Sequence, residues 1–233
     1  MSSFALRADG CGLVAGCWNG FAFLDPAGGT AMRLSDLPTE QPGFFLNDGR
    51  CDRSGNFWAG TVCESYDMPG AALFRLAPDG TRRRGAEGLL ASNGLAFAPD
   101  GRTLYYACSV VGVVWAFDLD PDDGVLTNRR VFARLHRPDG AMVDSNGCNW
   151  VASFGAGEVL RFTPDGREDR RIRLPVTQVS ACAFGGAAHD TLFVTTGTFR
   201  LTEAEAAAQP LAGSVFAVTG LGSTGLPEPR FGA

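Results

Sequence analysis

The fold of this chain is decided by LNDGRCDRSGNFWAGT, residues 46–61. A polar entry leads into a short apolar alternation, then a turn rich in Gly and Asp, then a second apolar alternation. Similar copies follow as SNGLAFAPDGRTLYYAC (92–108), PDGAMVDSNGCNWVAS (138–153) and VSACAFGGAAHDTLFVTT (179–196). A fainter copy, SSFALRADGCGLVAG, occupies residues 2–16. Short alternating runs bounded by turn residues are typical of paired β-strands.

The copies share one register. When they are aligned on the first apolar alternation, one position carries a side-chain oxygen in every copy: Ser2, Asn47, Asn93, Asp139 and Ser180. The intervals between these residues are 45, 46, 46 and 41 residues. A period of this length, built only of strands and turns, predicts an all-β chain folded as a β-propeller. No linker interrupts the repeat, so we expect a single domain over residues 1–233.

Composition excludes several kinds of function. The 233 residues carry a net charge of −5, which argues against nucleic acid as a partner. All 20 basic residues are Arg, so chemistry that needs a Lys amine is excluded. No signal peptide or membrane-length apolar run is present, which predicts a cytoplasmic protein with no membrane partner. The seven Cys lack a CxxC spacing, so we expect reduced, mostly buried thiols rather than a zinc or redox site.

Two further segments have a clear pattern. Arg-rich runs such as Arg129-Arg130 and Arg170-Arg171 fall where the fourth strand of a repeat is expected. Charge on an outer strand prevents unwanted strand pairing, so these runs are interpreted as exposed edges rather than anion sites. One helix is predicted over residues 202–209, because Thr202 can cap it, acids fill its first turn and Pro210 stops it.

The shared register also predicts a site. In a propeller the innermost strand of each blade borders the central channel, so Asn47, Asn93 and Asp139 would converge there. Amide and carboxylate oxygens suit Ca²⁺, Mg²⁺ or Mn²⁺ and are tolerable for Zn²⁺. Any one of these Asn-Gly or Asp-Gly pairs could equally be an ordinary turn, and only the common register favours a site. Glu64 and Ser65 could face the channel mouth or solvent.

At these residues the chain resembles the SMP-30/gluconolactonase/LRE-like family, which includes regucalcin. The matching runs extend over nearly the whole chain in the family's order: 47–50, 58–61, 92–95, 128–130, 138–140, 174–176 and 184–186. The resemblance implies a propeller of the six-bladed type. It also implies a hydrolase acting on the carboxylic ester of a sugar lactone, its small-molecule partner, with one divalent metal ion (Ca, Zn, Mn or Mg) as cofactor.

The resemblance assigns roles to individual residues. Asn93 and Asp139 match two protein ligands of the metal, and Asp139 also matches the family's proton donor and acceptor. Asn47 matches a substrate-contacting asparagine. A substrate-contacting glutamate of the family aligns with Ser65, and Glu64 is the adjacent residue.

Besides Ser65 in place of that glutamate, the chain departs from the family pattern in two more places. Phe45 stands where the family has a substrate-binding arginine, so less polar lactones are expected. The first metal ligand, a glutamate in an N-terminal Gly-Glu-Gly-Pro-like segment, has no counterpart, because residues 2–7 already match the following blade. We therefore expect about five blades, with the first blade largely missing.

This departure leaves alternatives open. One is a catalytically weak or inactive metal-binding propeller, and another is a fragment of a longer gene product that is unstable alone. Oligomers could form through exposed blade edges, where we expect Phe4, Leu6, Phe216 and Val218 to meet water.

Overall fold

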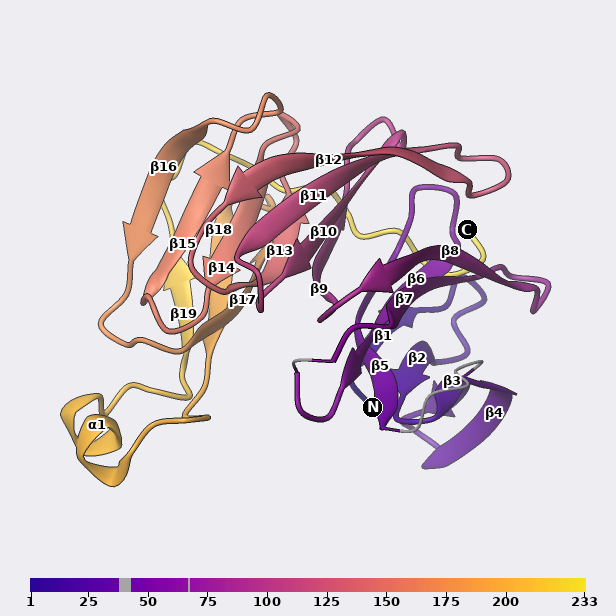
Figure 1. Ribbon diagram of the computed structural model, residues 1–233, viewed down its shortest axis with the longest axis horizontal. Helices are drawn as coiled ribbons and strands as arrows, with labels where there is room; N and C mark the ends of the chain where they lie inside the picture. Colours follow the sequence, from indigo (N-terminus) through magenta and orange to yellow (C-terminus); the bar gives the residue numbers. More distant parts are fainter. Residues whose placement is uncertain (38–42, 67) are drawn as a thin grey trace.

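The computed structural model describes residues 1–37, 43–66 and 68–233, and these residues form five antiparallel sheets. The sheets follow one another along an arc, from β1–β4 through β9–β12 to β17–β19 (Figure 1). Each sheet is a meander in which consecutive strands pair, as expected for propeller blades. The predicted all-β propeller with about five blades is therefore confirmed.

Each of the first four sheets has four strands and the last has three. The strands of the first two sheets are β1 (Ser3–Leu6), β2 (Leu13–Cys17), β3 (Gly20–Asp25), β4 (Thr30–Asp36), β5 (Phe44–Cys51), β6 (Phe57–Cys63), β7 (Ala71–Leu76) and β8 (Arg82–Leu89). The strands of the other three are β9 (Asn93–Phe97), β10 (Thr103–Cys108), β11 (Val113–Leu119), β12 (Leu126–Arg134), β13 (Pro138–Val143), β14 (Asn149–Ser153), β15 (Glu158–Phe162), β16 (Glu168–Arg173), β17 (Val179–Gly185), β18 (Thr191–Thr196) and β19 (Val215–Val218).

The predicted helix is α1 (Glu203–Ala208), which lies between β18 and β19 and projects away from the sheets (Figure 1). Thr202 caps it: its hydroxyl accepts a hydrogen bond from the Glu205 backbone N–H, and the Glu205 carboxylate accepts one from the Thr202 N–H. This reciprocal capping box satisfies two backbone donors at the helix start. No residue of α1 is buried, so the caps rather than core packing define the helix.

The hydrophobic core lies between the sheets. Four clusters of buried side chains fill the spaces between successive sheets, and Trp58 and Trp150 are fully buried in two of them. The innermost strands of neighbouring sheets also lie side by side: β1 by β5, β5 by β9, β9 by β13 and β13 by β17. Each blade is therefore stabilised by its neighbours, and replacing a buried Trp of this kind with Ala would cost about 3–5 kcal/mol.

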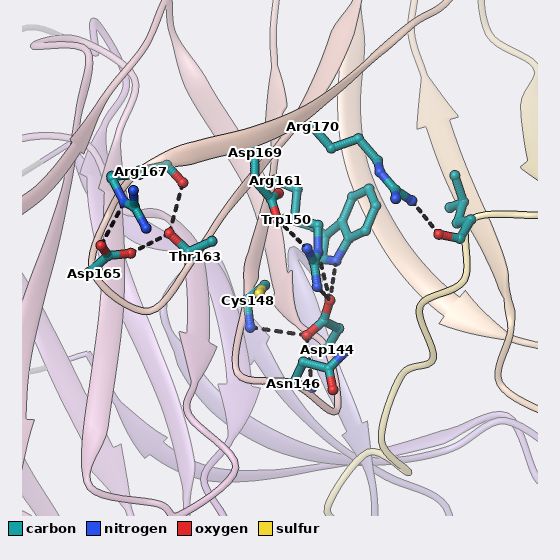
Figure 2. Close-up of polar contacts among 11 residues, drawn as sticks. Asp144, Asn146, Cys148, Trp150, Arg161, Thr163, Asp165, Arg167, Asp169 and Arg170 are labelled. Carbon is teal, nitrogen blue, oxygen red and sulfur yellow. Dashed lines mark hydrogen bonds and ion pairs between the residues drawn. The ribbon is translucent and has the colours of Figure 1, made fainter.

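A buried carboxylate anchors the fourth sheet (Figure 2). Asp144, fully buried after β13, accepts hydrogen bonds from the Trp150 indole N–H (2.9 Å) and from the Arg161 guanidinium Nε (2.9 Å). The backbone N–H groups of Asn146 and Cys148 also donate to it, at 2.9 and 3.0 Å. Because every bond of this charged group is satisfied within the blade, it ties the turn to the second and third strands.

The second sheet repeats this arrangement. Asp52 accepts hydrogen bonds from the Trp58 indole N–H (2.7 Å) and the Asn56 backbone N–H (2.9 Å), and the Arg75 Nε lies 3.9 Å from its carboxylate. Each Trp follows its Asp by six residues, so the two repeats carry the same internal anchor. Each aspartate therefore stabilises its own blade from within.

The two ends of the chain meet. Phe231 pairs in parallel with Arg7, its N–H donates to the Leu6 carbonyl (2.9 Å), and its own carbonyl accepts from Ala8 (2.9 Å). Phe231 is buried in the core cluster between the first two sheets. The segment after β19 thus runs past the fourth and second sheets to the first, and the C-terminus lies near β6 and β8 (Figure 1).

The expected exposed edges are present in part. Phe4 and Leu6 on β1 are 55% and 54% exposed, as predicted. Phe216 and Val218 were predicted to be exposed, but they are half-buried against the core cluster of the last two sheets. Alternation along β19 instead places Val215 in water, at 63% exposure.

All seven cysteines are free, and five of them are buried, as predicted. Burial raises the pKa of the Cys51 and Cys182 thiols to about 12, so these thiols stay protonated and unreactive. Among the residues that the structure describes, no helix has both the length and the apolar character needed to span a membrane.

Candidate functional site

Each inner strand from the second sheet to the fifth carries a bulge at the shared register position. Pairing shifts by one residue between Leu46 and Gly49 in β5 and between Pro138 and Ala141 in β13, with equivalent shifts in β9 and β17. A bulge removes residues from the regular ladder and changes the direction of their side chains. The repeat therefore places Asn47 and Asp139 at irregularities where polar groups can leave the sheet.

A chain of hydrogen bonds connects three blades at this level. The Asn47 side-chain amide donates to the Asn93 Oδ1 (2.9 Å) and to the Ser92 carbonyl (2.8 Å). The Asn93 amide donates to the Ser109 Oγ (2.7 Å), and Ser109 donates to the Pro138 carbonyl (2.7 Å). These bonds fix the orientation of both asparagines. In the described part of the chain no donor reaches the Asn47 Oδ1, so this oxygen is available to a ligand.

Gly94 brings the two proposed metal ligands together. Its φ is +52°, in the left-handed region that glycine tolerates best. A Cβ at this position would lie 2.5 Å from the Asp139 carbonyl oxygen and 2.7 Å from the Ala107 Cβ. Only glycine therefore allows β9 and β13 to approach this closely, and Asn93 and Asp139 sit on these two strands.

The local electrostatics at Asp139 are set by burial and by a second carboxylate. Burial raises the pKa of Asp139 to about 7, and the nearby charge of Asp48 adds to this effect. Burial also raises the pKa of Asp48, whose carboxylate accepts hydrogen bonds from the backbone N–H groups of Leu95 (2.8 Å) and Gly49 (2.9 Å). Asp139 has no cationic partner among the described residues, so a bound cation would relieve this repulsion.

The donor set fits a hard divalent cation. It combines the Asp139 carboxylate with the Asn93 amide oxygen, which uses one lone pair for Asn47 and keeps the other free. Oxygen ligands of this kind suit Ca²⁺, Mg²⁺ or Mn²⁺. Across residues 1–37, 43–66 and 68–233, no cluster of three or more His, Cys, Asp or Glu side chains could hold a metal. Water would therefore complete the coordination of any ion bound here.

The predicted residues share one cavity of about 910 Å³. Asn47, Ser65, Asn93 and Asp139 all line it. Glu64 is exposed and does not belong to its lining, so Ser65 is the residue of this pair that faces the cavity.

Ser109 and Phe45 lie close to these residues in sequence or in hydrogen bonding, and only Ser109 reaches the cavity. Ser109, which connects Asn93 to β13, lines the cavity as well. Phe45 does not: it is buried and stacks on Trp18 with ring centroids 4.2 Å apart. The aromatic ring that replaces the family's arginine therefore packs against the first blade, and it forms no apolar wall of the cavity.

Several lining residues were missed by the sequence analysis. They are basic or aromatic and lie on loops or at the ends of strands: Arg134, Arg137, Arg200, Tyr66, Phe154 and Phe199. One signal could have found some of them, because Arg134-Leu135-His136-Arg137 directly precedes the register position at Asp139. Arg200 carries no such signal, since it reaches the cavity from the loop between β18 and α1.

Comparison with known proteins places the chain among related propellers. The sequence model of the SMP-30/Gluconolactonase/LRE-like region matches residues 1–198. A 6-deoxy-6-sulfogluconolactonase of Pseudomonas putida is 38% identical over 99% of this chain and 80% of its own length. Regucalcin of Danio rerio is 36% identical over 89% of this chain and 72% of its own length.

A solved structure from a relative has the same fold. A calcium-binding protein, regucalcin, from Agrobacterium tumefaciens superposes with a TM-score of 0.90 at 27% identity, over 98% of this chain and 78% of that one. The family match, the identity to both relatives and the shared propeller lead to one conclusion: this chain belongs to the SMP-30/gluconolactonase/LRE-like family.

Proposed function

We propose that this protein hydrolyses the ring ester of a sugar lactone, with Asp139 as general base and a divalent cation held by Asn93 and Asp139. One observation carries the proposal: bulges on three inner strands bring Asn47, Asn93 and Asp139 to the lining of one cavity. The family and the Pseudomonas putida relative, which is named for a lactonase activity, support the same chemistry.

Asp139 is suited to proton transfer near neutral pH. Burial raises its pKa to about 7 in the metal-free site, and a bound cation would lower that pKa, so the carboxylate would be ionised and able to accept a proton at neutral pH. Asp139 would take a proton from the attacking water as the water oxygen bonds to the carbonyl carbon. The ester C–O bond then breaks, and Asp139 returns the proton to the ring oxygen, which gives a hydroxy acid.

The other residues bind and orient the substrate. The Asn47 Oδ1 can accept a hydrogen bond from a sugar hydroxyl, because its amide nitrogen is already held by Ser92 and Asn93. Ser65 offers a hydroxyl at the cavity lining. A divalent cation bound by Asn93 and Asp139 would supply a Lewis acid for the ester carbonyl and lower the pKa of a water.

The proposal is tested by hydrolysis of D-glucono-1,5-lactone, followed by acid release in weakly buffered solution. Metal-stripped protein should be inactive, and Ca²⁺, Mg²⁺, Mn²⁺ or Zn²⁺ should restore the rate above the spontaneous reaction. Asp139→Asn is the matched variant, because it keeps the shape and an oxygen ligand but removes the base. Equal rates with and without protein, with every metal, would refute the proposal.

A metal-binding propeller without turnover is the second candidate. It is favoured by the donor set, since the described residues offer no group of three or more His, Cys, Asp or Glu side chains that could hold the ion. Calorimetry with the same four metals separates the two functions. Metal binding without hydrolysis would support this second candidate, whereas metal-dependent hydrolysis would exclude it.

A further inference from the structure

The cavity has the opposite charge to the rest of the molecule. Arg134, Arg137 and Arg200 line it, and Asp139 is the single acidic side chain among its described lining residues. The chain as a whole carries a net charge of −5. A cationic cavity in an anionic protein concentrates anions from solution and orients them before they bind.

Within the described part of the chain, the three arginines have no acidic partners. None of them forms an ion pair with an acidic residue in the described ranges, whereas arginines on the outer strands do, as Arg130 does with Asp118. The Arg200 guanidinium instead lies 5.9 Å from the Tyr66 ring centroid, on the wall of the same cavity. Three positive charges around one cavity repel each other, and a bound anion would offset this electrostatic repulsion.

The backbone at these residues is unusual. Five described residues other than glycine have positive φ, and three of them line this cavity: Tyr66 (64°), Arg137 (38°) and Arg200 (66°). Side chains other than Gly, Asn and Asp rarely adopt this conformation, and it persists where surrounding structure imposes it. Residues held this way concentrate at ligand-binding positions. The fold therefore maintains two of the three arginines at the cavity in a conformation that costs free energy.

We propose that the lactone bound here carries a negatively charged group, such as a sulfonate, phosphate or carboxylate, remote from its ring carbonyl, and that Arg134, Arg137 and Arg200 bind that group. This inference rests on the proposed lactonase function of the same cavity. A guanidinium donates two parallel hydrogen bonds to an oxyanion, which gives both affinity and orientation. The Asp139 carboxylate repels the same anion, so the substrate's charged end goes to the arginines and its ester goes to Asp139.

Binding of open-chain acids tests this inference without any need for turnover. Calorimetry should compare D-gluconate, 6-phospho-D-gluconate and 6-deoxy-6-sulfo-D-gluconate, which differ at the carbon remote from C1. Either 6-substituted acid should bind about tenfold more tightly than gluconate, as expected for added hydrogen bonds to a charged group. The preference should fall as salt is raised. The tighter of the two identifies the anion that the site prefers.

Variants separate the arginines from general charge effects. Arg137→Gln and Arg200→Gln should each remove most of the preference for the 6-substituted acid over gluconate. Arg102→Gln is the control, because Arg102 is an exposed arginine outside this cavity. Equal binding of the three acids, or an equal loss in the Arg102 variant, would overturn the inference.

Hydrolysis of the neutral D-glucono-1,5-lactone distinguishes this inference from the function it rests on. If the protein selects the 6-substituted acids but hydrolyses no lactone, the anion site stands and the lactonase proposal fails. If it hydrolyses gluconolactone but binds all three acids equally, the lactonase proposal stands and the anion site fails.

Discussion

Replacing Gly94 with alanine tests how the site is assembled. The added methyl group destabilises the fold in two ways. An L-residue in the left-handed conformation found here, with φ of +52°, costs about 1–2 kcal/mol. The Cβ would also lie 2.5 Å from the Asp139 carbonyl oxygen and 2.7 Å from the Ala107 Cβ, closer than such atoms can approach. Forcing atoms into a packed region costs about 1–3 kcal/mol more.

The expected total is about 2–5 kcal/mol, a large part of the roughly 5–15 kcal/mol that stabilises a typical domain. Relief requires β9 to move away from β13, which separates Asn93 from Asp139. We therefore expect Gly94→Ala to lower stability and metal affinity together. Urea unfolding measures the first, with a midpoint lowered by about 1–2 M. Calorimetry with Mn²⁺ measures the second.

Gly29→Ala is the matched control. Gly29 has a φ of +65°, and a Cβ there would meet nothing within 4 Å. This variant pays the conformational cost alone, about 1–2 kcal/mol, and should keep full metal affinity. If the two variants lose the same stability within about 0.5 kcal/mol, the close approach of β9 and β13 is not what requires glycine at position 94.

Three further outcomes are expected. Asp139→Asn should lower kcat for lactone hydrolysis by about 10²–10⁴-fold while leaving the urea midpoint of the metal-free protein unchanged or raised, since it removes a general base from a buried site. The affinity for Mn²⁺ should fall about tenfold for each pH unit below 7 and level off above it, because protons compete for an Asp139 carboxylate whose pKa is about 7. Asp144→Asn should cost about 3–5 kcal/mol in urea unfolding, since it leaves the buried Arg161 guanidinium without its main partner.

The Asp139 and Asp144 predictions can each be checked by a further measurement. The raised pKa of Asp139 also means that its ionisation opposes folding, so metal-free protein should lose stability as pH rises from about 4 to 7. That trend should vanish in Asp139→Asn, and its persistence there would assign it to another group. For Asp144 the control is Asp165→Asn, which removes an exposed carboxylate paired with Arg167 (Figure 2) and should cost less than about 1 kcal/mol.

The sequence alone determined the architecture and the core of the site. Its 41–46-residue period fixed the number of sheets, because each copy carries its own turns and its own apolar alternation. The same register predicted that Asn47, Asn93 and Asp139 would share a cavity, since equivalent residues of repeated blades occupy equivalent places. The helix after Thr202 was also predictable, because capping depends only on residues close in sequence.

Only the tertiary structure decided which side chains from loops and strand ends reach the cavity. Arg134 ends strand β12 and Arg137 and Arg200 lie on loops, and only the packing of the blades brings the three to one cavity. Phe45 aligns with a position that the resemblance assigns to substrate binding, yet packing against Trp18 directs its ring into the first blade. Side-chain direction at a loop or strand end depends on contacts with distant segments, whereas the repeat fixes only position along the strand.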